Sequence, residues 1–240
     1  MNLVVDVGNS MVKAAIFSKN GDAIDTCRFA GNNIETLRQL VAPFRIEKAL
    51  LAASGNISEA VLEFMSGFRY LVFNDELSLP IRINYEQPSK IGKDRIAGAV
   101  AVCRKYPDKN NLYIDMGTCI TYNLIREGVI FEGGAISPGI KMRLDAMHHF
   151  TKSLPEVQVD GTPEFPVFDT KKAMRAGAMQ GAIFEIEQFI LSFQNKYEIN
   201  NVIITGGDAY IFEKSSNFKI FVHPNLVLEG LNEILEYNAQ

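Results

Sequence analysis

The chain has few cysteines, and their spacing suits neither disulfides nor zinc. Cys27, Cys103 and Cys119 are odd in number and far apart, and no CxxC pair occurs. This pattern argues against a disulfide framework and a structural zinc site, and it fits a reducing cytoplasm. There is also no GxSxG motif, so serine-type hydrolysis has no support.

An excess of positive charge and long apolar runs are also missing. The chain has 24 Lys and Arg against 28 Asp and Glu, a net charge of −4. Proteins that bind nucleic acid through its phosphates usually carry a basic excess, so we expect no such partner. No stretch approaches the ~20 apolar residues of a membrane span. Asp6 interrupts the apolar N-terminal run, and no signal peptide is visible. We expect a cytoplasmic protein without a membrane partner.

The remaining composition is that of a globular protein. The 240 residues are 47% hydrophobic and 22% charged, which excludes disorder, collagen and coiled coil. At roughly 150 residues per domain, the length allows one large domain or two small ones.

The strongest organisational signal is an internal repeat. LVVDVGNS (3–10) resembles LYIDMGTC (112–119), and each motif is an apolar run followed by Asp, an apolar residue, Gly and a small polar pair. We call residues 6–10 the first DxG turn and residues 115–119 the second DxG turn. Each is followed by two predicted strands joined by a turn. These strands are residues 11–17 and 23–29 in the first half, and 120–125 and 129–134 in the second.

Both halves then change to helical periodicity, which predicts two α/β lobes of similar build. We place the lobes at residues 1–111 and 112–240. Predicted helices contain Ile34 to Val41, Ile57 to Met65, residues after Ser137–Pro138, and a long segment after Thr170; predicted strands are 48–54, 70–73 and 202–205. Two proline-containing segments, 74–93 and 151–169, look irregular.

A DxG turn between two strands is suited to phosphate binding. Glycine lets the backbone approach a phosphate closely, and successive N–H groups form an anion-binding concavity. Ser10 or Thr118 can add a hydroxyl donor, Asp6 or Asp115 can hold a cation, and Lys13 can neutralise charge. A single copy is better explained as a plain β-turn, because Asp and Gly are common turn residues. Two copies in the same context favour phosphate binding and suggest a nucleotide triphosphate.

Two further segments allow both a functional and a structural interpretation. TGGDA (205–209) can pass flat against a nucleoside, or it can be a helix entry with Asp208 as N-cap. In the helix predicted from 90–107, Asp94 can be only the N-cap, or a general base with Arg95 beside it for a substrate anion. Gly177 and Gly181 form a GxxxG spacing that predicts close helix packing, with a subunit interface as one option.

The ordered set of motifs resembles a known family. The doubled strand–DxG–hairpin unit is similar to the acetate and sugar kinase, heat-shock chaperone and actin superfamily. Within it, the sequence looks like a type III pantothenate kinase over nearly its whole length. The motifs that carry the resemblance are DVGNS (6–10), GKDR (92–95), DMGTCIT (115–121), GGAISPGIKMRLDAM (133–147), DTKKAMRAG (169–177), TGGDA (205–209) and HPNLVLEGLNEI (223–234).

The resemblance implies a fold, a reaction and an assembly. The fold is α/β, with two duplicated actin-like (ribonuclease H-like) lobes, mixed sheets flanked by helices, and a nucleotide cleft between the lobes. The reaction is the ATP-dependent phosphorylation of pantothenate to 4′-phosphopantothenate, which begins coenzyme A biosynthesis. Magnesium accompanies ATP, a monovalent cation (K⁺ or NH₄⁺) is required, and family members are homodimers.

The resemblance also implies residue roles. Asp94 is the catalytic proton acceptor, and Asp115 holds the monovalent cation. The pantothenate site contains Tyr85, Gly92, Lys93, Arg95 and Thr170. The ATP contacts are Asp6, Val7, Gly8, Asn9, Ser10, Met11, Val12, Lys13 and Thr118.

Several positions depart from the family pattern: Ser10 replaces the commoner Thr, Cys119 replaces a small residue, and Asn123 stands where Asp is frequent. Ala14 and Ala15 also occupy a region where members often carry Gly. Two other functions fit the same fold. One is a kinase for another small hydroxylated or carboxylated metabolite, which a substrate panel would identify. The other is an ATP-binding accessory or regulatory module without turnover, which would bind ATP without pantothenate-dependent ADP release.

Overall fold

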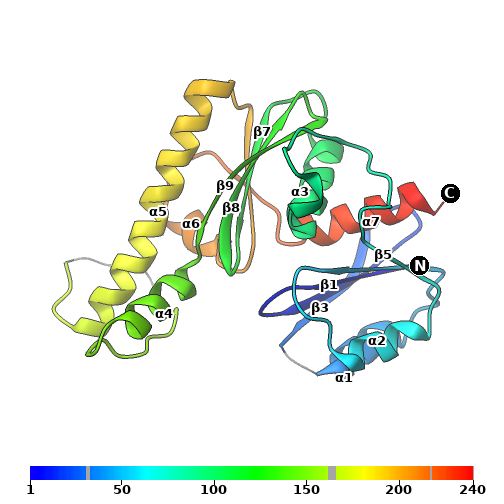
Figure 1. Cartoon of the computed structure of the whole chain (residues 1–240), viewed down its shortest axis with the longest axis horizontal. Coiled ribbons are helices and arrows are strands. Elements are labelled where there is room, and N and C mark those ends of the chain that lie inside the picture. Colours follow the sequence, from blue (N-terminus) through cyan, green and yellow to red (C-terminus); the bar gives the residue numbers. More distant parts are fainter. Residues whose placement is uncertain (31–32, 162–165, 217, 240) are drawn as a thin grey trace. The chain divides into compact units, whose positions relative to one another are not determined.

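The computed structural model describes residues 1–30, 33–161, 166–216 and 218–239, which form an α/β fold with two sheets (Figure 1). The chain packs into two compact units. The first comprises Met1–Asp108, Ile125–Glu132 and Asn225–Gln240, and the second comprises Lys109–Leu124 and Gly133–Pro224. The duplicated lobes at 1–111 and 112–240 stay a prediction.

The first unit contains a five-stranded sheet of order β3-β2-β1-β4-β5. Strands β1 and β2 are antiparallel and place Asp6 opposite Lys13, whereas β1 and β4 are parallel. The elements of this unit are β1 (Asn2–Val7), β2 (Val12–Phe17), β3 (Ala23–Phe29), α1 (Ile34–Val41), β4 (Lys48–Ala53), α2 (Glu59–Ser66), β5 (Tyr70–Val72), β6 (Arg82–Ile83), the 3₁₀ turn η1 (Pro88–Lys90), α3 (Lys93–Lys105) and α7 (Leu226–Asn238).

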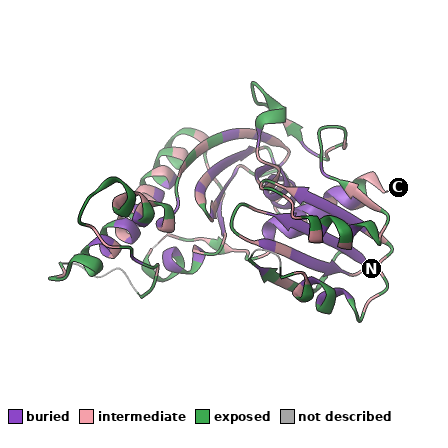
Figure 2. Ribbon diagram, turned by 60° about the horizontal axis from the view of Figure 1, so that its bottom comes forward, coloured by how far each residue is buried: buried purple, intermediate pink, exposed green. Residues whose placement is uncertain are grey.

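Helices cover both faces of this sheet (Figure 1). Alternate residues of a strand point to opposite faces, and Leu3 and Val5 of β1 pack in one apolar cluster with Leu37 of α1 and Val61 of α2. The central strands therefore form a continuous buried block (Figure 2). The first DxG turn begins at the end of β1. The buried strands therefore hold the start of the turn in a fixed position.

The opposite face of the sheet is covered by α7, which comes from the C-terminal end of the chain. The Asn2 side-chain amide donates hydrogen bonds to Asn232 Oδ1 at 2.9 Å and to Glu236 Oε1 at 2.6 Å. Lys48 Nζ lies 2.7 Å from the other Glu236 oxygen. Helix α7 also packs on α3. The start of α3, with Asp94, is thus attached to the first sheet through α7.

The second unit is built on β7, β8, β9 and β10. The sheet has six strands in the order β11-β10-β7-β8-β9-β6. Its last pair, β6 with the first residues of β9, belongs to the first unit. The elements are β7 (Asn111–Met116), β8 (Cys119–Arg126), β9 (Ile130–Pro138), α4 (Ile140–Phe150), α5 (Thr170–Tyr197), β10 (Asn201–Thr205), α6 (Ala209–Ser215) and β11 (Phe221–Val222). Apolar residues of β7, β10 and α5 share one core.

Most expected elements are present, but two helix starts are wrong. Ile57 was predicted to lie in a helix, whereas it precedes Ser58, the N-cap of α2. Ser137 and Pro138 were predicted to open a helix, whereas they end β9, and α4 begins at Ile140 with Gly139 as its N-cap. Gly139 keeps an extended conformation and donates its N–H to the Thr118 carbonyl. This long-range bond holds the chain extended past the proline. The described part of segment 151–169 forms neither helix nor strand, and Pro163 lies outside the described residues.

Within the described part of the chain, the GxxxG spacing on α5 does not correspond to close packing. A Cβ atom added at Gly177 or Gly181 would meet no atom of the described residues within 4 Å. Among the described residues, every helix also falls short of the length or apolar character needed to cross a bilayer.

Candidate active site

The first DxG turn reverses the chain between β1 and β2. The Gly8 N–H donates to the Met11 carbonyl at 3.0 Å and closes the turn. Asp6 is 6% exposed, whereas Asn9 and Ser10 at the tip are exposed. Strand pairing puts Lys13 opposite Asp6, so a cationic and an anionic group flank the turn. Exposed backbone amides beside a cation fit an anion such as phosphate.

Gly55 supports this turn, and the sequence reasoning missed it. The N–H groups of Ser54 and Gly55 both donate to the Val7 carbonyl, at 2.9 and 3.1 Å. A Cβ at Gly55 would lie 2.7 Å from the Gly8 carbonyl oxygen, closer than non-bonded atoms approach. The signal was the sequence SGN (54–56) directly after a buried strand, but its partner is far away in the chain.

The second DxG turn leaves β7 and is packed against the TGG segment that follows β10. Register places Thr205 beside Asp115. Gly206 has φ +99°, and a Cβ there would lie 2.5 Å from Asp115 Oδ1. The Asp208 N–H donates to the Met116 carbonyl at 3.0 Å. Two motifs that are 90 residues apart in the sequence therefore form one continuous surface.

Asp208 occupies the N-cap position of α6, as one interpretation expected, but its side chain makes no capping hydrogen bond. Burial raises the pKa of its carboxyl above the ordinary value.

Asn123 is fully buried, and its amide donates to the Tyr113 carbonyl and to Thr121 Oγ1. This departure from the family pattern therefore has a structural role inside the sheet.

Asp94 lies in the first turn of α3 and is not the N-cap. The N-cap is Gly92, so the interpretation of Asp94 as merely a cap is wrong. The Arg95 N–H donates to Asp94 Oδ1 at 2.9 Å. A Cβ at Gly92 would lie 2.5 Å from the same oxygen. The glycine at position 92 thus leaves space for a carboxylate held at the beginning of the helix.

Phe131 of β9 links two predicted pantothenate residues, and the sequence reasoning missed it. Its ring is fully buried. The Arg95 guanidinium lies 5.5 Å from the ring centroid, and the Tyr85 ring lies 6.4 Å away. Arg95 itself is 6% exposed. The cation–π contact orients the guanidinium within the first unit, beside Asp94 in sequence. Strand β9 is 35 residues further along the chain, so no local pattern revealed this partner.

The other two predicted pantothenate side chains have different surroundings. Lys93 Nζ donates to Asp75 Oδ1 and lies 5.4 Å from the Phe73 ring centroid, so its ammonium is already neutralised locally. Thr170 belongs to the second unit, where it is the exposed first residue of α5. Its participation in the pantothenate site stays a prediction.

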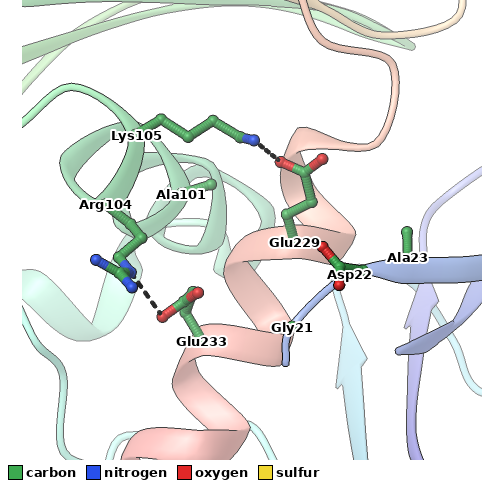
Figure 3. A pocket seen from close by; sticks show the side chains of 8 residues that line it. All are labelled: Gly21, Asp22, Ala23, Ala101, Arg104, Lys105, Glu229 and Glu233. Carbon is green, nitrogen blue, oxygen red and sulfur yellow. Dashed lines mark ion pairs between the residues drawn. The ribbon is translucent and has the colours of Figure 1, made fainter. Parts of the chain in front are cut away.

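A pocket of about 320 Å³ in the first unit contains none of the predicted site residues. Four of its charged side chains pair across α3 and α7, Lys105 with Glu229 and Arg104 with Glu233, whereas Asp22 also lines the pocket outside these pairs (Figure 3). Arg104 lies ten residues beyond Asp94 on α3, about 15 Å along the helix axis. Because the pocket is lined by none of the predicted site residues, we do not assign it to the active site.

Each DxG turn, taken by itself, has one carboxylate of the kind that helps to hold a divalent cation arriving with a nucleotide. Within the described residues, no group of three or more His, Cys, Asp or Glu side chains could hold a metal ion. Magnesium in nucleotide-dependent enzymes is bound by one or two carboxylates together with substrate phosphates and water. Asp6 and Asp115, each at the end of a buried strand, are of that type.

Two mixed α/β units, each with a DxG turn between the first two strands of its sheet, define an actin-like fold. Solved structures agree. A Baf family protein from Campylobacter jejuni has a TM-score of 0.62 at 20% identity, covering 99% of this chain and 98% of its own. The ADPNP-bound activator of 2-hydroxyisocaproyl-CoA dehydratase from Clostridium difficile has a TM-score of 0.56 at 11% identity, covering 99% and 96%.

Sequence comparison defines the family. The type III pantothenate kinase family model matches residues 2–192. The type III pantothenate kinase of Cytophaga hutchinsonii is 39% identical over 100% of both chains, and that of Christiangramia forsetii is 37% identical over 99% of both. The chain belongs to the type III pantothenate kinase family. It phosphorylates pantothenate, the first step of coenzyme A biosynthesis, and uses ATP with a divalent metal.

Gly55→Ala tests the support of the first DxG turn. The added methyl group must displace the Gly8 backbone, so we expect the KM for ATP to rise about tenfold and stability to fall by about 1–3 kcal/mol. Steady-state kinetics and thermal unfolding measure the two effects. The control is Gly67→Ala at the end of α2, where a Cβ would meet an ordinary contact at 3.4 Å. An unchanged KM for ATP in Gly55→Ala would remove Gly55 from the site.

Proposed function

We propose that Asp94 accepts the proton of the pantothenate primary hydroxyl. The observation that carries this assignment is the position of its carboxylate, held by the Arg95 N–H at the start of α3 and fitted closely against Gly92. The hydroxyl oxygen bonds to the γ-phosphorus while the bond between that phosphorus and the β,γ-bridging oxygen breaks. ADP leaves, and the hydroxyl proton moves to Asp94. Positioning of this kind provides most of the catalysis in phosphoryl transfer.

The neighbouring side chains are proposed to bind the rest of pantothenate. Arg95, oriented by Phe131, is suited to the substrate carboxylate, because a guanidinium donates two parallel hydrogen bonds to such a group. Tyr85, which is 40% exposed, offers an apolar ring face with a hydroxyl. Gly92, Lys93 and Thr170 complete the set that the family resemblance implies.

The ATP contacts are proposed at residues 6–13 and at Thr118. Exposed turn amides at Asn9 and Ser10, and the Lys13 ammonium, are suited to phosphate oxygens. When bound, the divalent metal neutralises negative charge on the transferring phosphoryl group. We also propose that Asp115 contributes to a monovalent cation site. Its carboxylate lies against Gly206, beside backbone carbonyls such as that of Met116, and oxygen donors suit hard cations.

A homodimer is proposed from the exposed face of α5. Gly177, Gly181, Phe184 and Leu191 recur at helical spacing, so they share one face of the helix. A Cβ at either glycine would meet no atom of the residues that the structure describes within 4 Å. Phe184 is 52% exposed and Leu191 is 40% exposed. Small and apolar residues on one open face are suited to close packing against a second copy.

A cytoplasmic location is proposed from the cysteines. Cys27, Cys103 and Cys119 are free thiols, and burial raises the pKa of Cys27 to about 11 and that of Cys103 to about 12. Free thiols of this kind persist in a reducing compartment.

Asp94→Asn tests the proton acceptor. The amide keeps the shape of the carboxylate but does not accept the proton, so we expect kcat to fall about 10²- to 10⁴-fold, with little change in the KM for ATP. ADP release with saturating pantothenate provides the measurement. Asp25→Asn, an exposed carboxylate on β3, is the control and keeps wild-type kcat. A near wild-type rate in Asp94→Asn would show that another group takes the proton.

Replacing potassium with sodium tests the cation site. ADP release is expected to require pantothenate and potassium together and to fall strongly in sodium. Asp115→Asn should raise the potassium concentration needed for half-maximal rate at least fivefold. Equal rates in both salts would contradict the monovalent cation site. ATP binding without pantothenate-dependent ADP release would indicate a regulatory module.

Phe184→Glu tests the dimer. A charge placed at the centre of the open α5 face should convert the dimer to a monomer, as measured by light scattering after size-exclusion chromatography. Gln188→Glu is the comparison variant, because Gln188 is exposed on the same face and is already polar. We expect this variant to weaken the dimer less than Phe184→Glu does. A wild-type protein that is already monomeric at 50 μM (about fifty times a 1 μM Kd) would refute the interface.

A further inference from the structure

One carboxylate in the second unit joins three secondary-structure elements. Glu185 of α5 accepts hydrogen bonds from the Tyr122 hydroxyl of β8 at 2.9 Å, from the Ser137 hydroxyl of β9, and from Arg143 Nη2 of α4 at 2.7 Å. No role was expected for Glu185 from the sequence. Its three donors lie 63, 48 and 42 residues away in the chain.

The network is partly shielded from water, so its hydrogen bonds are stronger than they would be in open solvent. The Tyr122 ring is fully buried and stacks on Phe189, one helical turn beyond Glu185, with 4.1 Å between ring centroids. Burial alone would raise the pKa of the Glu185 carboxyl, but the bonds from Ser137, Arg143 and Tyr122 outweigh it and lower that pKa. Burial also raises the pKa of the Tyr122 hydroxyl. The carboxylate therefore stays ionised and the phenol stays a donor.

The network continues to the second DxG turn through the backbone between β9 and α4. Arg143 uses its Nε to donate to the Pro138 carbonyl at 2.9 Å, so one guanidinium connects Glu185 with that backbone. The next residue, Gly139, donates its N–H to the Thr118 carbonyl at 3.1 Å. A Cβ at Gly139 would lie 2.5 Å from the same oxygen. Any movement of residues 137–139 must therefore move Thr118.

We propose that Glu185 is a positioning residue for nucleotide binding, because it holds Ser137 and Arg143 and thereby fixes the Pro138–Gly139 backbone against Thr118. This inference rests on the proposed contact between Thr118 and ATP. A hydroxyl that donates to a phosphate must be held to within about half an ångström. Glu185 provides that constraint from a helix that carries none of the proposed ATP contacts.

Glu185→Gln is the principal test. The amide is isosteric, but it is neutral and has one acceptor oxygen in place of two, so it no longer satisfies all three donors. We expect the KM for ATP to rise about five- to tenfold, while the KM for pantothenate at saturating ATP changes less than twofold. A purely structural role would lower the melting temperature without separating the two KM values. Glu187→Gln, two residues further along the same helix, is the matched control and keeps both KM values.

Two further variants make the outcome decisive. Ser137→Ala removes one donor without touching the charge and should raise the KM for ATP two- to threefold, which tests the proposal even if Glu185→Gln does not fold. Thr118→Ala should raise the KM for ATP directly. If Thr118→Ala raises it and both network variants leave it unchanged, the positioning role is wrong while the turn's function stands. If Thr118→Ala leaves it unchanged, the proposed ATP contact is wrong and the positioning role is overturned with it.

Discussion

The close approach of backbone to backbone at a few glycines is the constraint on which both DxG turns depend. Gly55 lies against the Gly8 carbonyl, while Gly206 and Gly139 lie against residues of the second turn. At each of these positions a methyl group would occupy space already taken by an oxygen atom. A turn that binds phosphate must present its backbone to a ligand, so its position has to be fixed by the residues packed behind it. The supporting glycines hold the turns in position by backbone contact alone, because they carry no side chains.

Each turn has a different kind of support beyond these glycines. The first leaves a sheet whose central strands are buried on both faces, and α7 attaches to that sheet through Asn2. The second turn is held by the TGG segment on one side and by the Gly139 backbone on another. The Glu185 network adds a polar anchor, which is more directional than apolar packing and therefore specifies one geometry.

The proposed substrate residues of the first unit are positioned by a helix start and a buried ring. Asp94 follows a glycine N-cap and is oriented by its neighbour's N–H, whereas Arg95 is oriented by Phe131. A carboxylate and a guanidinium that are adjacent in sequence thus each have a separate contact that orients them: the Arg95 N–H for Asp94 and the Phe131 ring for Arg95.

Local chemistry in the sequence determined the strands, the DxG turns and most helices, because apolar periodicity and turn residues act over a few positions. The repeated turn, the GKDR box and their order were enough to predict the family and its reaction. The tertiary structure decided the roles of those residues whose contact partners are distant in the sequence. Gly139 bonded to Thr118 keeps Ser137 and Pro138 in a strand, Gly92 displaces Asp94 from the N-cap, and Gly55, Phe131 and Glu185 acquire roles. Such contacts join residues tens of positions apart, which no local pattern encodes.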